Sequence, residues 1–153
     1  MAEDEQDTTE LLAAELSVEL TSFIGCFGGG WTSLPSDGVD LDVDTTGLGN
    51  LFGPWHVHGR PFQIAMRPTG RREVEIGTPL GRWVGAGSLL WVVDRRERID
   101  VDDPELSARL SRLAKTRRTT FRYCTSCARI VGPEDRDGST CHDCMSRWLG
   151  VVF

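Results

Sequence analysis

The chain has 153 residues and a formal net charge of −6, and 39% of its residues are hydrophobic. This length predicts one domain, or one domain with a small metal-bound appendage. No uncharged apolar run reaches the roughly 18–20 residues that a membrane-spanning helix needs. The N-terminus is acidic, whereas a signal peptide begins with basic residues. These features argue against a helical membrane protein and predict a cytoplasmic one.

The charge is unevenly distributed along the chain. Residues 1–59 contain eleven acidic and no basic side chains, whereas residues 60–153 contain twelve acidic and seventeen basic ones. This division indicates either that the two halves attract each other or that they contact different partners.

The first predicted element is a helix over residues 8–24, which follows an acidic tail at residues 1–6. Asp7 and Glu10 stand three residues apart at its start, as in a capping box, and Gly25 suits its C-cap. The apolar face of this helix is expected to contain residues at helical spacing, namely Leu12, Leu16, Leu20 and Phe23.

Loops and then an antiparallel sheet are predicted next. Residues 26–54 are rich in Gly, Asp, Pro and Ser, and one short strand is expected near residues 39–43. Between residues 55 and 93, apolar residues alternate with polar ones, and Gly and Pro separate the runs. We expect four or five strands there, the last near residues 89–93.

A second helix is predicted to begin at Asp103, because Pro104 suits the first helical position and Glu105 the first turn. Its apolar stripe would consist of Leu106, Leu110 and Leu113. The predicted fold is therefore α+β. Its three parts are the tail at residues 1–6, a helix-and-sheet domain at residues 7–103, and a helix with a metal module at residues 104–153.

The most specific motif is a pair of Cys-x-x-Cys sequences, formed by Cys124, Cys127, Cys141 and Cys144. Two residues between ligands allow one turn to direct both sulfur atoms at one ion, and zinc favours four thiolates in a tetrahedron. A reducing compartment favours metal ligands over disulfides. Four Cys ligands leave no position for water, so the predicted zinc is structural. The alternative is a redox dithiol, but the first pair lacks the βαβ context typical of one.

Residues 121–148 resemble the four-cysteine zinc ribbons and treble clefs. The treble clef is favoured because residues 139–140 can cap a helix that begins at Cys141. Ala128 departs from the usual pattern, in which Gly is common after the first pair. The resemblance implies a zinc-stabilised module, and the class includes nucleic-acid binders, protein adaptors and purely structural modules.

A run of basic residues without any acid extends from Arg109 to Arg129. Arginine side chains hold phosphates with paired donors, and an aromatic ring can stack on a base. Alternatively, these residues pair with the acidic N-terminal half or are only solvated, and the net negative charge opposes strong non-specific binding. The predicted partner-binding residues are Arg112, Lys115, Arg117, Arg118, Arg122 and Tyr123.

Other candidate sites are weaker. The alternating acids at residues 40–44 lack the Gly and Glu that a calcium loop requires. His56 and His58 would share one face of a strand, but no third ligand is identifiable. Cys26 could be a nucleophile served by these histidines, although no known motif surrounds it and a buried inert thiol is expected. Four aromatic residues are expected in the core, namely Trp31, Trp55, Trp83 and Trp91.

Two functional hypotheses follow. In the first, the protein is a non-enzymatic, zinc-stabilised binding protein whose Arg-rich surface contacts nucleic acid or an acidic protein. In the second, it is a small acidic inhibitor of the immunity or antitoxin kind. Its residues 1–59 would then cover a basic toxin or a nucleic-acid enzyme, and zinc would only stabilise the fold. An enzyme that uses Cys26 or the two histidines is a third possibility, and no small-molecule substrate is identifiable.

Overall fold

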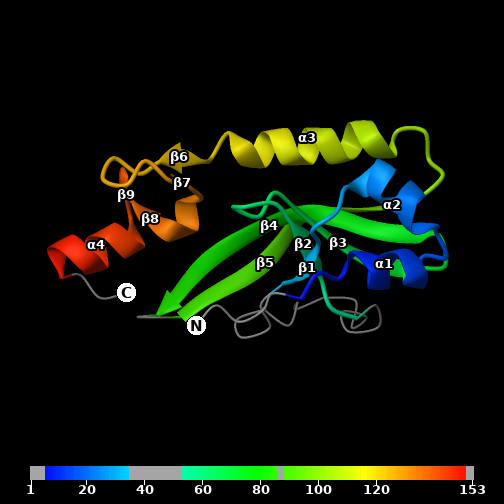
Figure 1. Ribbon diagram of the computed structural model, residues 1–153, viewed down its shortest axis with the longest axis horizontal. Helices are drawn as coiled ribbons and strands as arrows, with labels where there is room; N and C mark the ends of the chain where they lie inside the picture. Colours follow the sequence, from blue (N-terminus) through cyan, green and yellow to red (C-terminus); the bar gives the residue numbers. More distant parts are fainter. Residues whose placement is uncertain (1–5, 35–52, 86–87, 151–153) are drawn as a thin grey trace.

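The computed structural model describes residues 6–34, 53–85 and 88–150. Helices α1 (Thr9–Glu15) and α2 (Leu20–Phe27) precede a five-stranded antiparallel sheet, and a module that contains four cysteines follows it (Figure 1). This arrangement confirms the predicted α+β fold. No helix in the described part of the chain combines the length and the apolarity needed to cross a bilayer.

The predicted single N-terminal helix is wrong, because the chain breaks after α1. Ser17 has a φ of 55°, a left-handed conformation that ends a helix. Gly25 consequently lies inside α2, and the C-cap is Gly28, with a φ of 82°. The predicted apolar face is nevertheless buried in one core, which contains Leu12, Leu16 and Phe23, with Leu20 packed against it.

The start of α1 is capped differently from a capping box. The Asp7 carboxylate accepts a hydrogen bond from the Thr9 backbone N–H at 2.9 Å and another from the Thr9 hydroxyl. Both hydrogen bonds lower the pKa of Asp7, and the bond from the hydroxyl has the larger effect. The N-cap residue of α1 is Thr8, whose side chain forms no capping hydrogen bond, so the predicted cap at Asp7 is wrong by one position.

The sheet has the strand order β1-β2-β3-β4-β5, within the predicted four or five strands. Its members are β1 (Thr32–Ser33), β2 (His56–His58), β3 (Ile64–Gly70), β4 (Glu73–Gly85) and β5 (Ser88–Asp100). Strands β4 and β5 are longer than the other three, and the hairpin that they form extends toward the C-terminal module (Figure 1). The short strand expected near residues 39–43 lies outside the described residues.

An irregularity in β5 exchanges the faces of that strand. Arg95 has a φ of 53°, and the register with β4 shifts beside it. Trp91 and Val93 pack on one face of the sheet, whereas Ile99 packs on the other, in the core beneath the helices. In a regular strand, residues six positions apart, such as Val93 and Ile99, would lie on the same face. The extra residue at the bulge shifts this alternation by one, so Val93 and Ile99 lie on opposite faces of the sheet.

Helix α3 (Leu106–Arg118) packs on the sheet. It begins after the predicted start at Asp103, because Pro104 and Glu105 lie in the preceding turn. Leu106 and Leu110 are buried in the same core as the sheet and the N-terminal helices. The predicted boundary after residue 103 therefore falls between elements that share one core. We call the described residues 6–118 the body.

The C-terminal module, residues 121–150, consists of short elements. Two hairpins are formed by β6 (Arg122–Tyr123) with β7 (Ile130–Val131) and by β8 (Arg136–Asp137) with β9 (Thr140–Cys141). A 3-10 turn, η1 (Pro133–Asp135), connects the hairpins, and α4 (His142–Leu149) follows the second. Each of the four strands in these hairpins is two residues long.

Candidate functional site

The four predicted ligands come together in the C-terminal module. The sulfur atoms of Cys124, Cys127, Cys141 and Cys144 all lie within 4.8 Å of one another. Those of Cys127 and Cys141 are 3.9 Å apart. Four sulfurs bound to one ion at about 2.3 Å in a tetrahedron would be separated by about 3.8 Å. The cluster therefore has the size of a four-thiolate metal site.

The first cysteine pair lies in the turn between β6 and β7. The Cys124 N–H donates to the Arg129 carbonyl at 2.8 Å, and the Ala128 N–H donates to the Cys124 carbonyl at 2.8 Å. Ala128 has a φ of 60°, which explains why Gly is common at this position in such turns. The turn thus aims both sulfur atoms at one point.

Backbone donors surround the Cys124 sulfur. The N–H groups of Cys141 and Ser126 lie 3.3 and 3.4 Å from it. Hydrogen bonds from backbone N–H groups lower the pKa of Cys124 to about 6. The N–H of Cys141 has the largest effect, and that of Cys127 the next largest. The thiolate, which is the metal-binding form, is therefore favoured at this ligand.

The second pair lies at the start of α4. Cys141 is the N-cap of α4, and Cys144 lies in its first turn. Hydrogen bonding with the Cys141 sulfur, together with burial and the other sulfurs, raises the pKa of Cys144 to about 12. Four thiols this close together do not all ionise unless a cation offsets their charge, and a bound metal supplies that charge. Since four sulfur ligands complete a tetrahedron, such an ion has a structural role.

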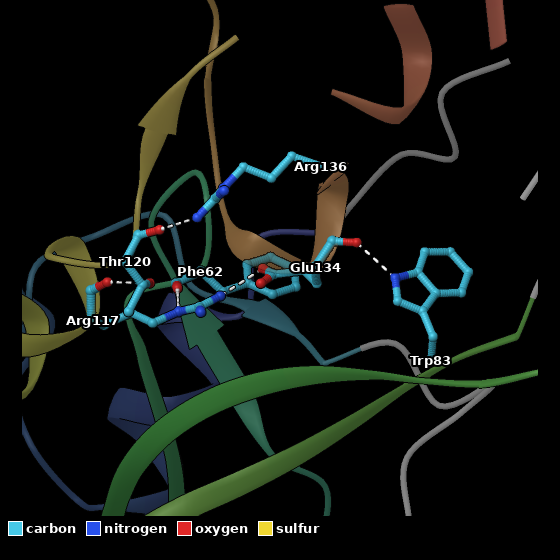
Figure 2. Close-up of polar contacts among 6 residues, drawn as sticks. All are labelled: Phe62, Trp83, Arg117, Thr120, Glu134 and Arg136. Carbon is cyan, nitrogen blue, oxygen red and sulfur yellow. Dashed lines mark hydrogen bonds and ion pairs between the residues drawn. The ribbon is translucent and has the colours of Figure 1, made fainter. Parts of the chain in front are cut away.

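A buried ion pair joins the module to the body (Figure 2). Arg117 Nη2 donates to Glu134 Oε1 at 2.5 Å, and each side chain is only 1% exposed. Arg117 Nε also donates to the Phe62 carbonyl at 3.0 Å, and Trp83 Nε1 donates to the Glu134 carbonyl at 2.8 Å. Through Glu134, the turn η1 is therefore fixed to α3 and to β4 at once.

Two glycines make room for Glu134. A Cβ on Gly81 would lie 2.8 Å from the Glu134 Cβ, and one on Gly132 would lie 2.6 Å from its Oε1. Real Cβ atoms do not approach other atoms so closely, so both positions require the absence of a side chain. The contacts around Glu134, which join the module to the body, are consequently close-packed.

The predicted partner-binding residues separate into exposed and buried ones. Arg117 is buried, so its inclusion in a partner surface is wrong. Its position seven residues after Leu110 places it on the buried side of α3, a signal that the sequence already contained. The other five side chains are exposed, namely Arg112, Lys115, Arg118, Arg122 and Tyr123.

We call Arg112, Lys115, Arg118 and Arg122 the basic stripe. Arg118 Nη1 donates to Gln63 Oε1 at 3.1 Å, and Arg122 Nη1 donates to two nearby carbonyls. Arg112 and Lys115 form no ion pair with any residue that the structure describes. The described acids of the N-terminal half therefore leave these two charges available to a partner.

The weaker candidates occupy structural positions. His56 is 2% exposed, its Nδ1 lies 2.9 Å from the Thr8 hydroxyl, and burial lowers its pKa. The His58 ring lies 5.1 Å from that of Trp31. Cys26 is exposed, so the expected burial of its thiol is wrong. The structure brings neither histidine into the cysteine cluster, and the acids at residues 40–44 lie outside the described residues.

The expected core position of Trp83 is also wrong. This side chain is 43% exposed, whereas Trp31, Trp55 and Trp91 are buried as predicted. Trp83 lies on the part of β4 that extends toward the module, where its ring meets His142 edge-on at 5.4 Å. His142 thus contributes a ring contact between the module and β4.

A cavity that the sequence did not indicate lies between the module and the body. Its volume is about 620 Å³. The wall comes from segments far apart in the chain, including Phe62 and Trp91 from the body and Ile130 and Asp143 from the module. No local motif could have predicted this cavity, because it exists only once the module is docked.

Comparison of this chain with protein-family models, with curated proteins and with solved structures finds no match in any of the three. The site itself must therefore carry any functional conclusion, and what it offers is a cluster of four cysteines within metal-binding distance, beside an exposed basic stripe.

Proposed function

We propose that the protein is a non-enzymatic nucleic-acid-binding protein whose C-terminal module is held in shape by one zinc ion. Zinc is the proposed metal because four thiolates in a closed tetrahedral set are typical of structural zinc. The order of elements supports a treble clef: a cysteine-bearing hairpin, a second hairpin, and a helix that carries the last ligands.

The observation that carries the proposal is the basic stripe. Its members are spaced by three, three and four residues, so they follow one side of α3 and continue onto β6. Successive charges three residues apart on a helix are separated by about 4.5 Å along its axis. This regular row of exposed positive charge is suited to a polyanion, and the buried Arg117 anchors the row from below.

The aromatic end of the stripe distinguishes nucleic acid from a merely acidic protein. Tyr123 directly follows Arg122 and is 70% exposed. An exposed tyrosine gains from stacking on a base, and that stacking tolerates any base sequence. Binding without strong sequence preference is the expected behaviour.

A salt titration tests the proposal. Affinity for fluorescently labelled single-stranded DNA and RNA should fall steeply with salt, by about 0.7 in log–log slope per phosphate contacted. The double variant Arg112→Ala/Lys115→Ala should bind more weakly, and its slope should be shallower by about 1.4.

The matched control is Arg71→Ala/Arg72→Ala, in the turn between β3 and β4. This variant also removes two positive charges, but near the other end of α3. It breaks the ion pair between Arg72 and Asp102, which is exposed and therefore contributes little to stability. Its salt slope should match that of the unmodified protein. If no nucleic acid binds at low salt, the proposal fails, and the inhibitor hypothesis with a protein partner becomes the better one.

A further inference from the structure

The cavity between the C-terminal module and the body has the features of a ligand site. Its volume of about 620 Å³ lies within the range of about 300–1,000 Å³ typical of small-molecule sites. Phe62 and Trp91 form one wall, with ring centroids 4.9 Å apart. Ile130 lines the module side and is 40% exposed, so the cavity is open at its edge.

The charges on the wall balance one another. Arg129 pairs with Asp143 at 3.1 Å, and the Arg60 guanidinium lies 5.7 Å from the centre of the Phe62 ring. Two further acids, Glu134 and Asp135, line the wall. The charge of Glu134 is offset by its ion pair with Arg117 behind the wall, so the two arginines of the wall face the two remaining acids, Asp135 and Asp143. Such a wall has no net charge with which to select a free phosphate or an ammonium group. Aromatic faces with mixed donors and acceptors favour an uncharged planar heterocycle.

The cavity adjoins the basic stripe through direct contacts. Arg118 donates to the side chain of Gln63, the residue that follows Phe62 in the cavity wall. On the module side, Tyr123 is the cross-strand partner of Ile130 in the β6–β7 hairpin. A strand whose phosphates lie on the stripe would therefore pass the mouth of the cavity.

We propose that the cavity receives one unpaired base from a single-stranded nucleic acid whose backbone lies along the basic stripe. This inference rests on the proposed function and narrows its ligand to single strands. The base would stack on Phe62 and Trp91, while the polar groups of the wall meet its edge. A duplex keeps its bases paired inside the stack, so it cannot fill the cavity without paying for unpairing.

The first test changes only the ligand. A single abasic position is moved along a short single-stranded oligonucleotide, and affinity is measured at each placement. Removing the one base that stacks in the cavity should weaken binding roughly 5- to 150-fold. Only the abasic placement that faces the cavity should show this loss. The intact single strand should also bind more tightly than the duplex of the same sequence.

The second test changes the wall. Phe62→Leu keeps an apolar side chain but removes the ring, and it should weaken single-strand binding while leaving the salt slope unchanged, since no phosphate contact is lost. Phe27→Leu, which makes the same change in the helix-covered core, is the control and should bind normally.

The results separate the inference from the function on which it rests. Equal affinity for single strand and duplex, with a normal salt slope and no sensitive abasic placement, would overturn the base pocket and leave the proposed function standing. Absence of binding to either form would overturn both.

Discussion

The body and the C-terminal module are held together by different forces. The body has an apolar core in which side chains from three helices pack against the sheet. The buried cluster of the module consists of Val131 and three cysteines, Cys124, Cys141 and Cys144. Hydrophobic stabilisation grows with the apolar area buried, so one valine contributes little. We therefore expect a metal ion bound by the four cysteines to stabilise the module as the apolar core stabilises the body.

Because different forces stabilise the two regions, we expect them to respond to different treatments. If the proposed zinc organises the module, a chelator should disrupt the module and leave the apolar core of the body in place. The two regions are nevertheless coupled, because Arg117 and Glu134 form a buried pair across their boundary. Three experiments test how far the regions are independent.

The largest effect is expected from removing a metal ligand. Cys141→Ser should release zinc and unfold the module, because the apparent binding free energy of a structural zinc is about 10–16 kcal/mol at pH 7. Elemental analysis should find about one zinc per chain in the unmodified protein and little in the variant. Far-UV circular dichroism should show that the body keeps most of its structure.

Cys26→Ser is the control for that experiment. Its thiol is exposed and lies outside the cysteine cluster, so zinc content should be unchanged. The zinc assignment is wrong if freshly purified, tag-free protein contains none.

An intermediate effect is expected from breaking the boundary ion pair. Arg117→Met leaves the Glu134 carboxylate buried without its partner, which should lower the free energy of unfolding by about 3–5 kcal/mol. Urea denaturation followed by tryptophan fluorescence measures this loss. The double variant Arg117→Met/Glu134→Gln should recover part of it, because the uncompensated charge is gone. A loss below about 1 kcal/mol for Arg117→Met would mean that the pair behaves as an exposed one.

The smallest effect is expected from pH, through His56 in the body. Burial lowers the pKa of His56, so the folded state binds its proton less readily than the unfolded chain does. The free energy of unfolding should therefore decrease as pH falls below about 6.5, by no more than about 1.4 kcal/mol per pH unit for this group. Measured at several pH values, His56→Gln should show a flatter dependence. An unchanged dependence would exclude His56 as the source.

The features that the sequence predicted well are local. Two Cys-x-x-Cys turns need only neighbouring residues to aim their sulfur atoms. The alternating apolar residues of β3 and β4, among them Met66 and Ile76, lie together in one core. The break at Ser17 carries no such signal, since serine rarely adopts a positive φ. Only the tertiary contacts of both helices with one core explain that break.

The features that the sequence missed depend on distant partners. The position of Arg117 on the buried side of α3 could be deduced from helical spacing, but its partners Glu134 and Phe62 could not. Trp83 was expected in the core because of its size, yet it is 43% exposed and lies near the end of β4, where that strand pairs only with β5. The cavity is missed for the same reason, because its two walls meet only in the tertiary structure.

The sequence separation of the boundary contacts has a consequence for the order of folding. The four cysteines lie between residues 124 and 144. Among the boundary contacts, the Arg117–Glu134 pair joins residues 17 positions apart, but the bonds from Arg117 to Phe62 and from Trp83 to Glu134 join residues 55 and 51 positions apart. Closing a longer loop costs more chain entropy, and non-local contacts form more slowly. We therefore expect the metal-bound hairpins to form early as a separate unit, with docking onto the body as the later event. The cavity would then appear only in the last stage of folding.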